Sequence, residues 1–76
     1  MTERLPRTTA EMLLRVLARD GWFVTRQSGS HVVMRHGSKP GRVVVPRHRS
    51  KTIKLATMAA ILEEAELSPE EFRRLL

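Results

Sequence analysis

The side chains best suited to proton-transfer chemistry in this sequence are three histidines, His31, His36 and His48. The chain has no cysteine and no tyrosine, which excludes a thiolate nucleophile, a disulfide and sulfur-ligated zinc. No acidic residue lies between Asp20 and Glu63, so a carboxylate pair for glycoside hydrolysis or two-metal chemistry is not expected. The histidines are irregularly spaced, unlike a metal-binding motif such as H-E-x-x-H. We therefore expect neither a metal nor a cofactor.

A histidine among basic residues suits the cleavage of RNA. Imidazole takes up and releases protons near neutral pH. RNA carries its own nucleophile, the 2′-hydroxyl, so an enzyme needs a base for it, an acid for the departing 5′-oxygen and positive charge for the phosphorane. One histidine with Arg and Lys neighbours can supply much of this without a metal. The alternative is that His31 is an ordinary surface residue of a strand and Ser30 a turn residue that bonds locally.

The whole chain has a formal net charge of +6, and the positive charge is concentrated in its middle. The segment between Asp20 and Glu63 contains eight basic residues and no acid: Arg26, Arg35, Lys39, Arg42, Arg47, Arg49, Lys51 and Lys54. In a small fold this segregation predicts a positive face that attracts phosphate polymers, whereas the alternative is that these residues only keep the surface soluble. Because no amphipathic basic helix is present, nucleic acid is favoured over membrane.

The first element expected is a helix over residues 8–20. Thr8 and Glu11 have the spacing of a capping box, and Gly21 stands where a helix needs a left-handed C-terminal residue. An apolar stripe at helical spacing is formed by Leu13, Val16 and Leu17.

Three strands are expected next, over residues 22–27, 31–36 and 42–46, rich in β-branched valine. Short turns separate them and predict an antiparallel meander. Alternation along the middle strand divides its side chains between two faces. Those expected to point outward are His31, Val33 and Arg35. Those expected to face the core are Val32, Met34 and His36.

A basic loop over 47–52 and a second long helix over 53–66 follow. The side chains expected to turn inward from that helix are Ile53, Ala56 and Ala60, together with Leu55 and Leu62. A short last helix begins with Ser68 as N-cap, Pro69 at the first position and Glu71 closing a capping box. The residues expected to anchor it are Phe72, Leu75 and Leu76.

The order of elements predicts a single α+β domain over residues 1–76. It is an α-β-β-β-α arrangement like the double-stranded-RNA-binding domain, with a three-stranded antiparallel sheet, two helices on one face and a short C-terminal helix. The first residues lack the apolar segment of a secretory signal, and no apolar run approaches the ~20 residues of a membrane span. We expect a soluble, cytoplasmic protein.

The sequence resembles the HicA toxins of bacterial toxin–antitoxin pairs. The resemblance rests on three segments in order, Gly21-Trp22, then R-Q-S-G-S-H over 26–31, then G-R-V-V-V-P-R-H over 41–48. It extends from the first helix through Leu67, and the chain departs from it at residues 55–57, where relatives more often have Gly-Thr. The resemblance implies a ribonuclease with a double-stranded-RNA-binding-like fold, whose catalytic histidine falls on His31, and whose activity a HicB antitoxin neutralises.

The leading hypothesis is thus a toxin that cleaves mRNA without a metal, with His31 as general base or acid. The residues expected to contact RNA are Gly29, Ser30, Arg35, Lys39, Arg47, His48 and Lys51. Gly29 and Ser30 would shape the turn that aims the imidazole. The partner acid stays open between His48 and a lysine, with His36 a weaker candidate.

Two other classes compete with this hypothesis. One is a non-catalytic RNA-binding module, in which His31 is one contact among several. The other is a DNA-binding regulator, which is disfavoured because neither long helix has a basic exposed face suited to a major groove. For the leading hypothesis we expect a monomer on its own and a hetero-oligomer with a HicB-like antitoxin, whose acidic surface lies over or beside His31.

Overall fold

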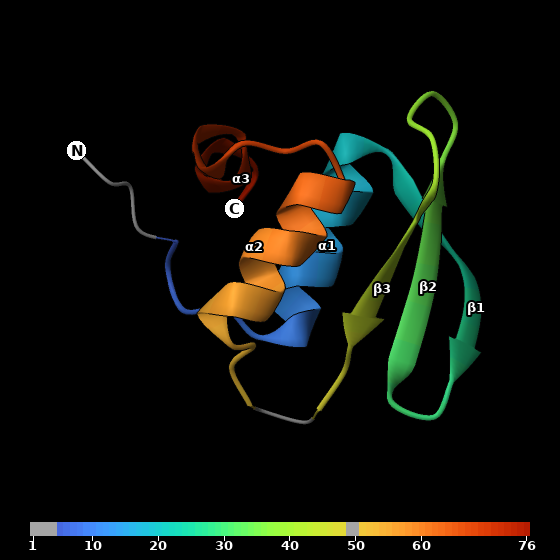
Figure 1. Ribbon diagram of the computed structural model, residues 1–76, viewed down its shortest axis with the longest axis horizontal. Helices are drawn as coiled ribbons and strands as arrows, with labels where there is room; N and C mark the ends of the chain where they lie inside the picture. The colour runs from blue at the N-terminus through green and yellow to red at the C-terminus, as the bar shows by residue number, and fades with distance from the viewer. Residues whose placement is uncertain (1–4, 49–50) are drawn as a thin grey trace.

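The computed structural model describes residues 5–48 and 51–76. Six elements follow one another along the chain: α1 (Ala10–Asp20), β1 (Trp22–Ser28), β2 (His31–His36), β3 (Arg42–Pro46), α2 (Leu55–Glu64) and α3 (Pro69–Leu75). The helices form one layer and the sheet the other (Figure 1). The predicted α+β fold, with the order α-β-β-β-α followed by a short helix, is confirmed.

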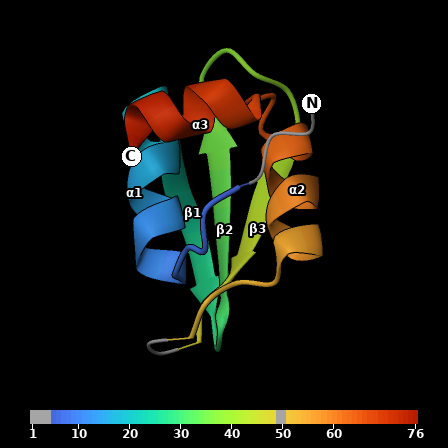
Figure 2. The same cartoon turned by 90° about the vertical axis from the view of Figure 1, so that its left-hand side faces the viewer.

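The sheet is an antiparallel meander in the order β1-β2-β3. On β2, Val32 and Met34 are buried whereas His31 and Arg35 are exposed, so the predicted alternation is correct. The strand β1 runs one residue further than expected, to Ser28, and has a bulge between Val24 and Arg26. None of the helices in the described segments lies on the outer face of the sheet: α1 and α2 both lie on the opposite face, and α3 crosses their upper ends (Figures 1 and 2).

The core lies between the sheet and the two long helices. Leu13, Val16 and Leu17 of α1 are fully buried, as the apolar stripe predicted. Burial of each such side chain contributes about 1.5–3 kcal/mol. They pack in one cluster with Val32 and Met34 of the sheet. In a chain this short, this single cluster provides most of the apolar burial.

The start of α1 differs from the prediction. Thr9, not Thr8, is the N-cap, and its side chain accepts a hydrogen bond from the backbone N–H of Met12. Thr8 is buried instead; its hydroxyl donates to the carbonyl of Pro6 at 2.8 Å, and its own carbonyl accepts from the N–H of Ile53 at 2.8 Å. Either of the two adjacent threonines could cap the helix. Because the Thr8 carbonyl is bonded to Ile53, Thr8 stays outside the helix and Thr9 becomes the N-cap.

The second helix is shorter than predicted, and only part of its predicted inner face is buried: Leu62 turns inward as expected. It begins at Leu55, two residues later than expected, so Ile53 is buried from the preceding extended segment. The side chains that turn inward are Met58, Ile61 and Leu62, with Ala65 just beyond the helix. Ala56, Ala60 and Leu55 are exposed, so those three predictions are wrong. Ile53 precedes the helix, so a helical repeat counted from Ile53 predicts a buried face that is turned away from the observed one.

The last helix closes the fold as expected. Ser68 and Glu71 form the predicted capping box, with Pro69 at the first position. Phe72 is fully buried and Leu75 partly, whereas Leu76 is exposed, contrary to the prediction. Arg19 of α1 donates to the carbonyl of Leu75 at 2.6 Å and fixes α3 against α1.

Among the helices of the described segments, none has the length and apolarity needed to cross a membrane.

Candidate active site

The turn before His31 is a two-residue hairpin loop. Ser28 and His31 are paired across β1 and β2, so only Gly29 and Ser30 lie between the strands. Gly29 has φ +57°, the positive value that two-residue hairpins with a glycine at the first position require. A side chain there would meet none of the described residues but would strain the backbone. The local sequence S-G-S-H therefore fixes where β2 begins, and His31 is its first residue.

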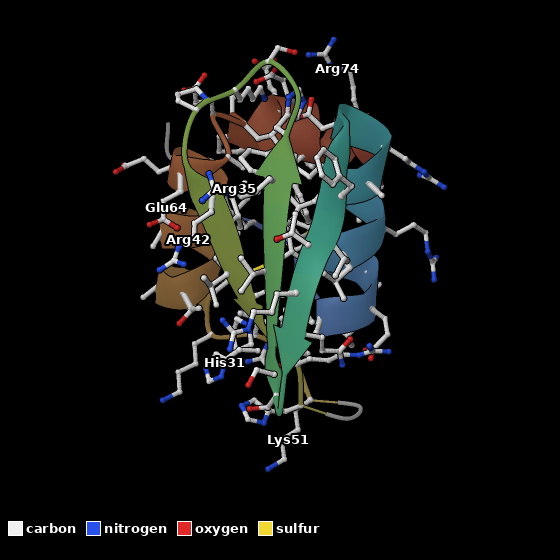
Figure 3. All side chains as sticks on the ribbon, turned by 90° about the vertical axis from the view of Figure 1, so that its right-hand side faces the viewer. His31, Arg35, Arg42, Lys51, Glu64 and Arg74 are labelled. Carbon is white, nitrogen blue, oxygen red and sulfur yellow. The ribbon has the colours of Figure 1, made fainter. Side chains whose placement is uncertain are left out.

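His31 projects from the outer face of the sheet. Its side chain is exposed, and its partner on β3 is Pro46. Figure 3 looks onto this outer face and shows His31 at the same end of the sheet as Lys51, with Arg35 further along β2. An imidazole at this position is open to a polymeric substrate, and cationic side chains lie at the same end.

The chain leaving β3 is tied back to this turn. The backbone N–H of Arg47 donates to the carbonyl of Ser30, and the Arg47 Nε donates to Glu11 Oε2 at 3.1 Å. The backbone N–H of Glu11 in the first turn of α1, and then the Arg47 guanidinium, hold the pKa of the Glu11 carboxyl below its ordinary value. Sequence reasoning missed Glu11 as a neighbour of the basic loop. Its position in the first helical turn gives no indication of a partner 36 residues away.

A pocket of about 360 Å³ opens at the same end of the sheet. Its wall contains Pro46, the residue paired with His31, and three side chains that can carry positive charge, His48, Lys51 and Lys54. Thr52, Ile53 and Thr57, the last in the first turn of α2, complete it. The helix has Lys54 as N-cap and no side-chain cap, so first-turn N–H groups add to the positive potential. The pocket therefore suits an anionic group such as phosphate.

Lys39 lies at the other end of β2 and is fully engaged there. Its ammonium donates to Asp20 Oδ2 at 2.7 Å and to the carbonyls of Ala65 and Glu66 at 2.9 and 3.2 Å. These carbonyls follow α2, so Lys39 joins the ends of α1 and α2. The structure does not bring Lys39 together with His31.

His36 is held at that same end. Its Nδ1 accepts from the N–H groups of Ser38 and Lys39 at 3.0 and 3.1 Å, and its Nε2 bonds the carbonyl of Asp20 at 2.7 Å. Its ring contacts the edge of Trp22. His36 turns inward, as predicted, but both ring nitrogens are committed to the backbone. It therefore is not a proton-transfer partner for His31.

The candidate site thus consists of one exposed imidazole, a tight turn that fixes it, and a cationic pocket at the same end. Within residues 5–48 and 51–76, no three His, Cys, Asp or Glu side chains come together in a group that could hold a metal ion. Arg35 shares the outer face with His31 but lies four residues along β2.

The sequence matches the model of a known protein family. Residues 10–67 match the family model described as the HicA toxin of bacterial toxin–antitoxin systems. The chain belongs to the HicA toxin family. The resemblance seen in the sequence is confirmed over more than half of the chain. A comparison with individual curated proteins finds no match.

The HicA match covers the site as well as the scaffold. It runs from the first residue of α1 to Leu67, and so includes the hairpin turn, His31 and the whole pocket wall, while α3 lies outside it. Membership of the HicA family supports a toxin role in a toxin–antitoxin system and, at a coarse level, nuclease activity.

Proposed function

We propose that this HicA-family chain is an endoribonuclease that cleaves mRNA in the cytoplasm without a metal ion, with His31 as its catalytic residue. The observation that carries the proposal is the position of His31. It is the first residue of β2, exposed and fixed by the Gly29–Ser30 turn, at the end of the sheet where the cationic pocket opens. Polyanion attraction and proton transfer are then available at one place.

The reaction needs two proton transfers and charge stabilisation. A base removes the proton from the 2′-hydroxyl, and the oxygen attacks the adjacent phosphorus. The bond from phosphorus to the 5′-oxygen breaks, and an acid gives that oxygen a proton. The products are a 2′,3′-cyclic phosphate and a 5′-hydroxyl. His31 is one of these two groups, and His48 or Lys51 of the pocket wall is the candidate for the other.

The remaining site residues would hold the substrate. Lys51 would contact phosphate in the pocket, and Arg47 would do so from the position set by Glu11. Gly29 and Ser30 act through the shape of the turn. Lys39 has no part in this proposal, because its ammonium is engaged at the opposite end of the sheet.

The replacement His31→Ala tests the proposal against a non-catalytic RNA-binding module. Cleavage should fall by about 10²–10⁴-fold, while RNA affinity and thermal stability stay close to those of the parent. The matched control is Gln27→Ala, an exposed residue of the same hairpin on the other face of β1. If His31→Ala still cleaves like the parent, the catalytic assignment is wrong. If the parent binds RNA and never cleaves it, the binding module is favoured.

A second test concerns the metal and the nucleophile. The parent should cleave RNA in excess chelator and leave 2′,3′-cyclic or 3′-phosphate ends. Products with 3′-hydroxyl ends would show that water attacked from the other side of the phosphate and would contradict the 2′-hydroxyl route.

We also propose that the free monomeric toxin forms a hetero-oligomer with a HicB-like antitoxin, whose acidic surface lies over or beside His31. The family match makes an antitoxin partner plausible. Complementary charge mainly speeds association, so reversing the charges of Arg47 and Lys51 should slow association more than it speeds dissociation. A complex that forms at an unchanged rate in that variant, or leaves RNA cleavage intact, would contradict this arrangement.

A further inference from the structure

The outer face of the sheet is organised as three rungs of side chains. Because residues paired across antiparallel strands point to the same face, the register places Ser28, His31 and Pro46 in one rung. The next rung contains Arg26, Val33 and Val44. The last contains Phe23, Arg35 and Arg42. His31 and Arg35 are separated along β2 by about 13 Å, the length of four strand residues.

The two arginine side chains of the last rung repel each other unless an anion is bound to this surface. Arg35 and Arg42 are direct partners, both are exposed, and like charges directly opposite destabilise a sheet. Among the described residues no hydrogen bond or ion pair neutralises either guanidinium. Figure 3 shows the two arginines on the open face, with Glu64 of α2 drawn between their labels; in the described segments no ion pair joins Glu64 to either arginine. A bound anion would remove this repulsion.

The same rung contains an exposed aromatic ring. Phe23 is the β1 partner of Arg35, and 53% of its surface is exposed. It stands outside the core cluster, so core packing does not explain it. Exposed aromatic rings beside arginines are the usual means of binding single-stranded nucleic acid, because the ring stacks on an unpaired base while the guanidinium contacts phosphate.

We infer that the outer sheet face binds single-stranded RNA along a track that starts at His31 and ends at the Phe23–Arg35–Arg42 rung. Phe23 stacks on a base and the two arginines contact phosphates, with Val33 and Val44 as the apolar floor between. The inference deepens the proposed function, since it assigns the path of the substrate away from the cleaved bond. RNA is favoured over an acidic protein because the track is continuous with the His31 site on one strand and one face. A duplex is disfavoured because its bases are not free to stack on Phe23.

Binding measurements in the His31→Ala background test the track, since the RNA then stays intact. The probes are a single-stranded oligonucleotide of about 12 nucleotides, a duplex of equal length and a trinucleotide. In Arg35→Gln/Arg42→Gln, the slope of log affinity against log salt should fall by about 1.4 for the long strand, because two phosphate contacts are lost. Phe23→Leu should weaken binding of that strand about tenfold with little change in slope. Neither change should affect the trinucleotide as strongly as the long strand.

The matched control is Arg15→Gln/Arg74→Gln, which removes the same charge from exposed positions on α1 and α3. If this control lowers affinity and slope as much as Arg35→Gln/Arg42→Gln, the track is wrong and only net charge matters. Equal or tighter binding of the duplex would also overturn it. If the arginine variant loses only an acidic antitoxin and keeps its RNA affinity, the face belongs to the protein partner. Failure of the parent to cleave RNA contradicts the proposed function, whereas these binding outcomes bear on the track alone.

Discussion

The two ends of β2 each carry a histidine, and the two side chains have opposite environments. His31 is exposed on the outer face, beside a turn of two residues. His36 lies against Trp22, with both ring nitrogens bonded to backbone groups. One strand thus presents one imidazole to solvent and uses the other to hold the fold. Residue type alone does not separate the two; in the described segments the ring nitrogens of His31 have no hydrogen-bond partner, which is why we propose His31 as the catalytic residue.

The lysines repeat this difference. Lys39, at the His36 end, joins Asp20 to the carbonyls after α2. Lys51, at the His31 end, is exposed in the wall of the cationic pocket. The contrast is between a structural end of the sheet, around Asp20, and the end around His31 that we propose to be functional. Replacements at the first should change stability, and replacements at the second should change the handling of RNA.

The largest stability effect is expected from Gly21→Ala at the structural end. Gly21 has φ +107°, and an added Cβ would lie 2.7 Å from His36 Nε2, the atom that bonds Asp20. Backbone strain and the displaced imidazole together should cost about 3 kcal/mol. Thermal unfolding measures this, with Gly37→Ala as control, since Gly37 has open space around it. Equal melting temperatures for the two variants would show that His36 does not hold this end.

An intermediate effect is expected from a pair of lysine replacements. Lys39→Met keeps the apolar stem but loses the bonds to Asp20 and the helix-end carbonyls, which should cost about 1–2 kcal/mol. Lys51→Met should leave stability within about 0.5 kcal/mol and lower the salt slope of RNA binding by about 0.7. Thermal melts and RNA titrations on both variants check this. If Lys39→Met kept the parental stability and lost RNA affinity instead, the different roles assigned to the two lysines would be wrong.

The smallest effect is expected at the exposed contact between Glu11 and Arg47. The pKa of the Glu11 carboxyl is lowered in the fold, first by its own backbone N–H and then by Arg47. Such a group stabilises the fold above its unfolded pKa and loses this contribution as the pH falls through the folded pKa. Glu11→Gln should therefore melt slightly below the parent at pH 7, and the two should converge below about pH 4. Glu70→Gln, at an exposed position of α3, is the control. A Glu11→Gln difference that persists at the lowest pH would contradict the ion pair.

Local patterns predicted the parts of this fold that local interactions determine. The alternation on β2 correctly exposed His31 and buried Val32 because sheet geometry repeats every two residues. The turn, the helix end at Gly21 and the Ser68 cap are likewise short-range features. They were sufficient to place the candidate catalytic side chain on the open face.

Contacts between distant residues were beyond such patterns. The face of α2 was misassigned because Ile53 is held by a bond to Thr8, far away in the sequence. Lys39 has the same charge and flexibility as Lys51, and only the approach of Asp20 and the end of α2 separates their roles. The ion pair of Glu11 with Arg47 joins residues 36 positions apart. Each of these depends on tertiary packing, which no periodicity in the sequence encodes.

The most direct test of the central claim compares His31→Ala with His36→Ala in one experiment. Single-turnover cleavage of RNA in excess chelator is measured beside thermal unfolding for both variants. We predict that His31→Ala loses at least about 100-fold in rate with an unchanged melting temperature. We expect His36→Ala to be less stable but to cleave at the parental rate where it is folded. A parental rate for His31→Ala, or a loss of rate confined to folded His36→Ala, would contradict the assignment of His31 as the catalytic residue.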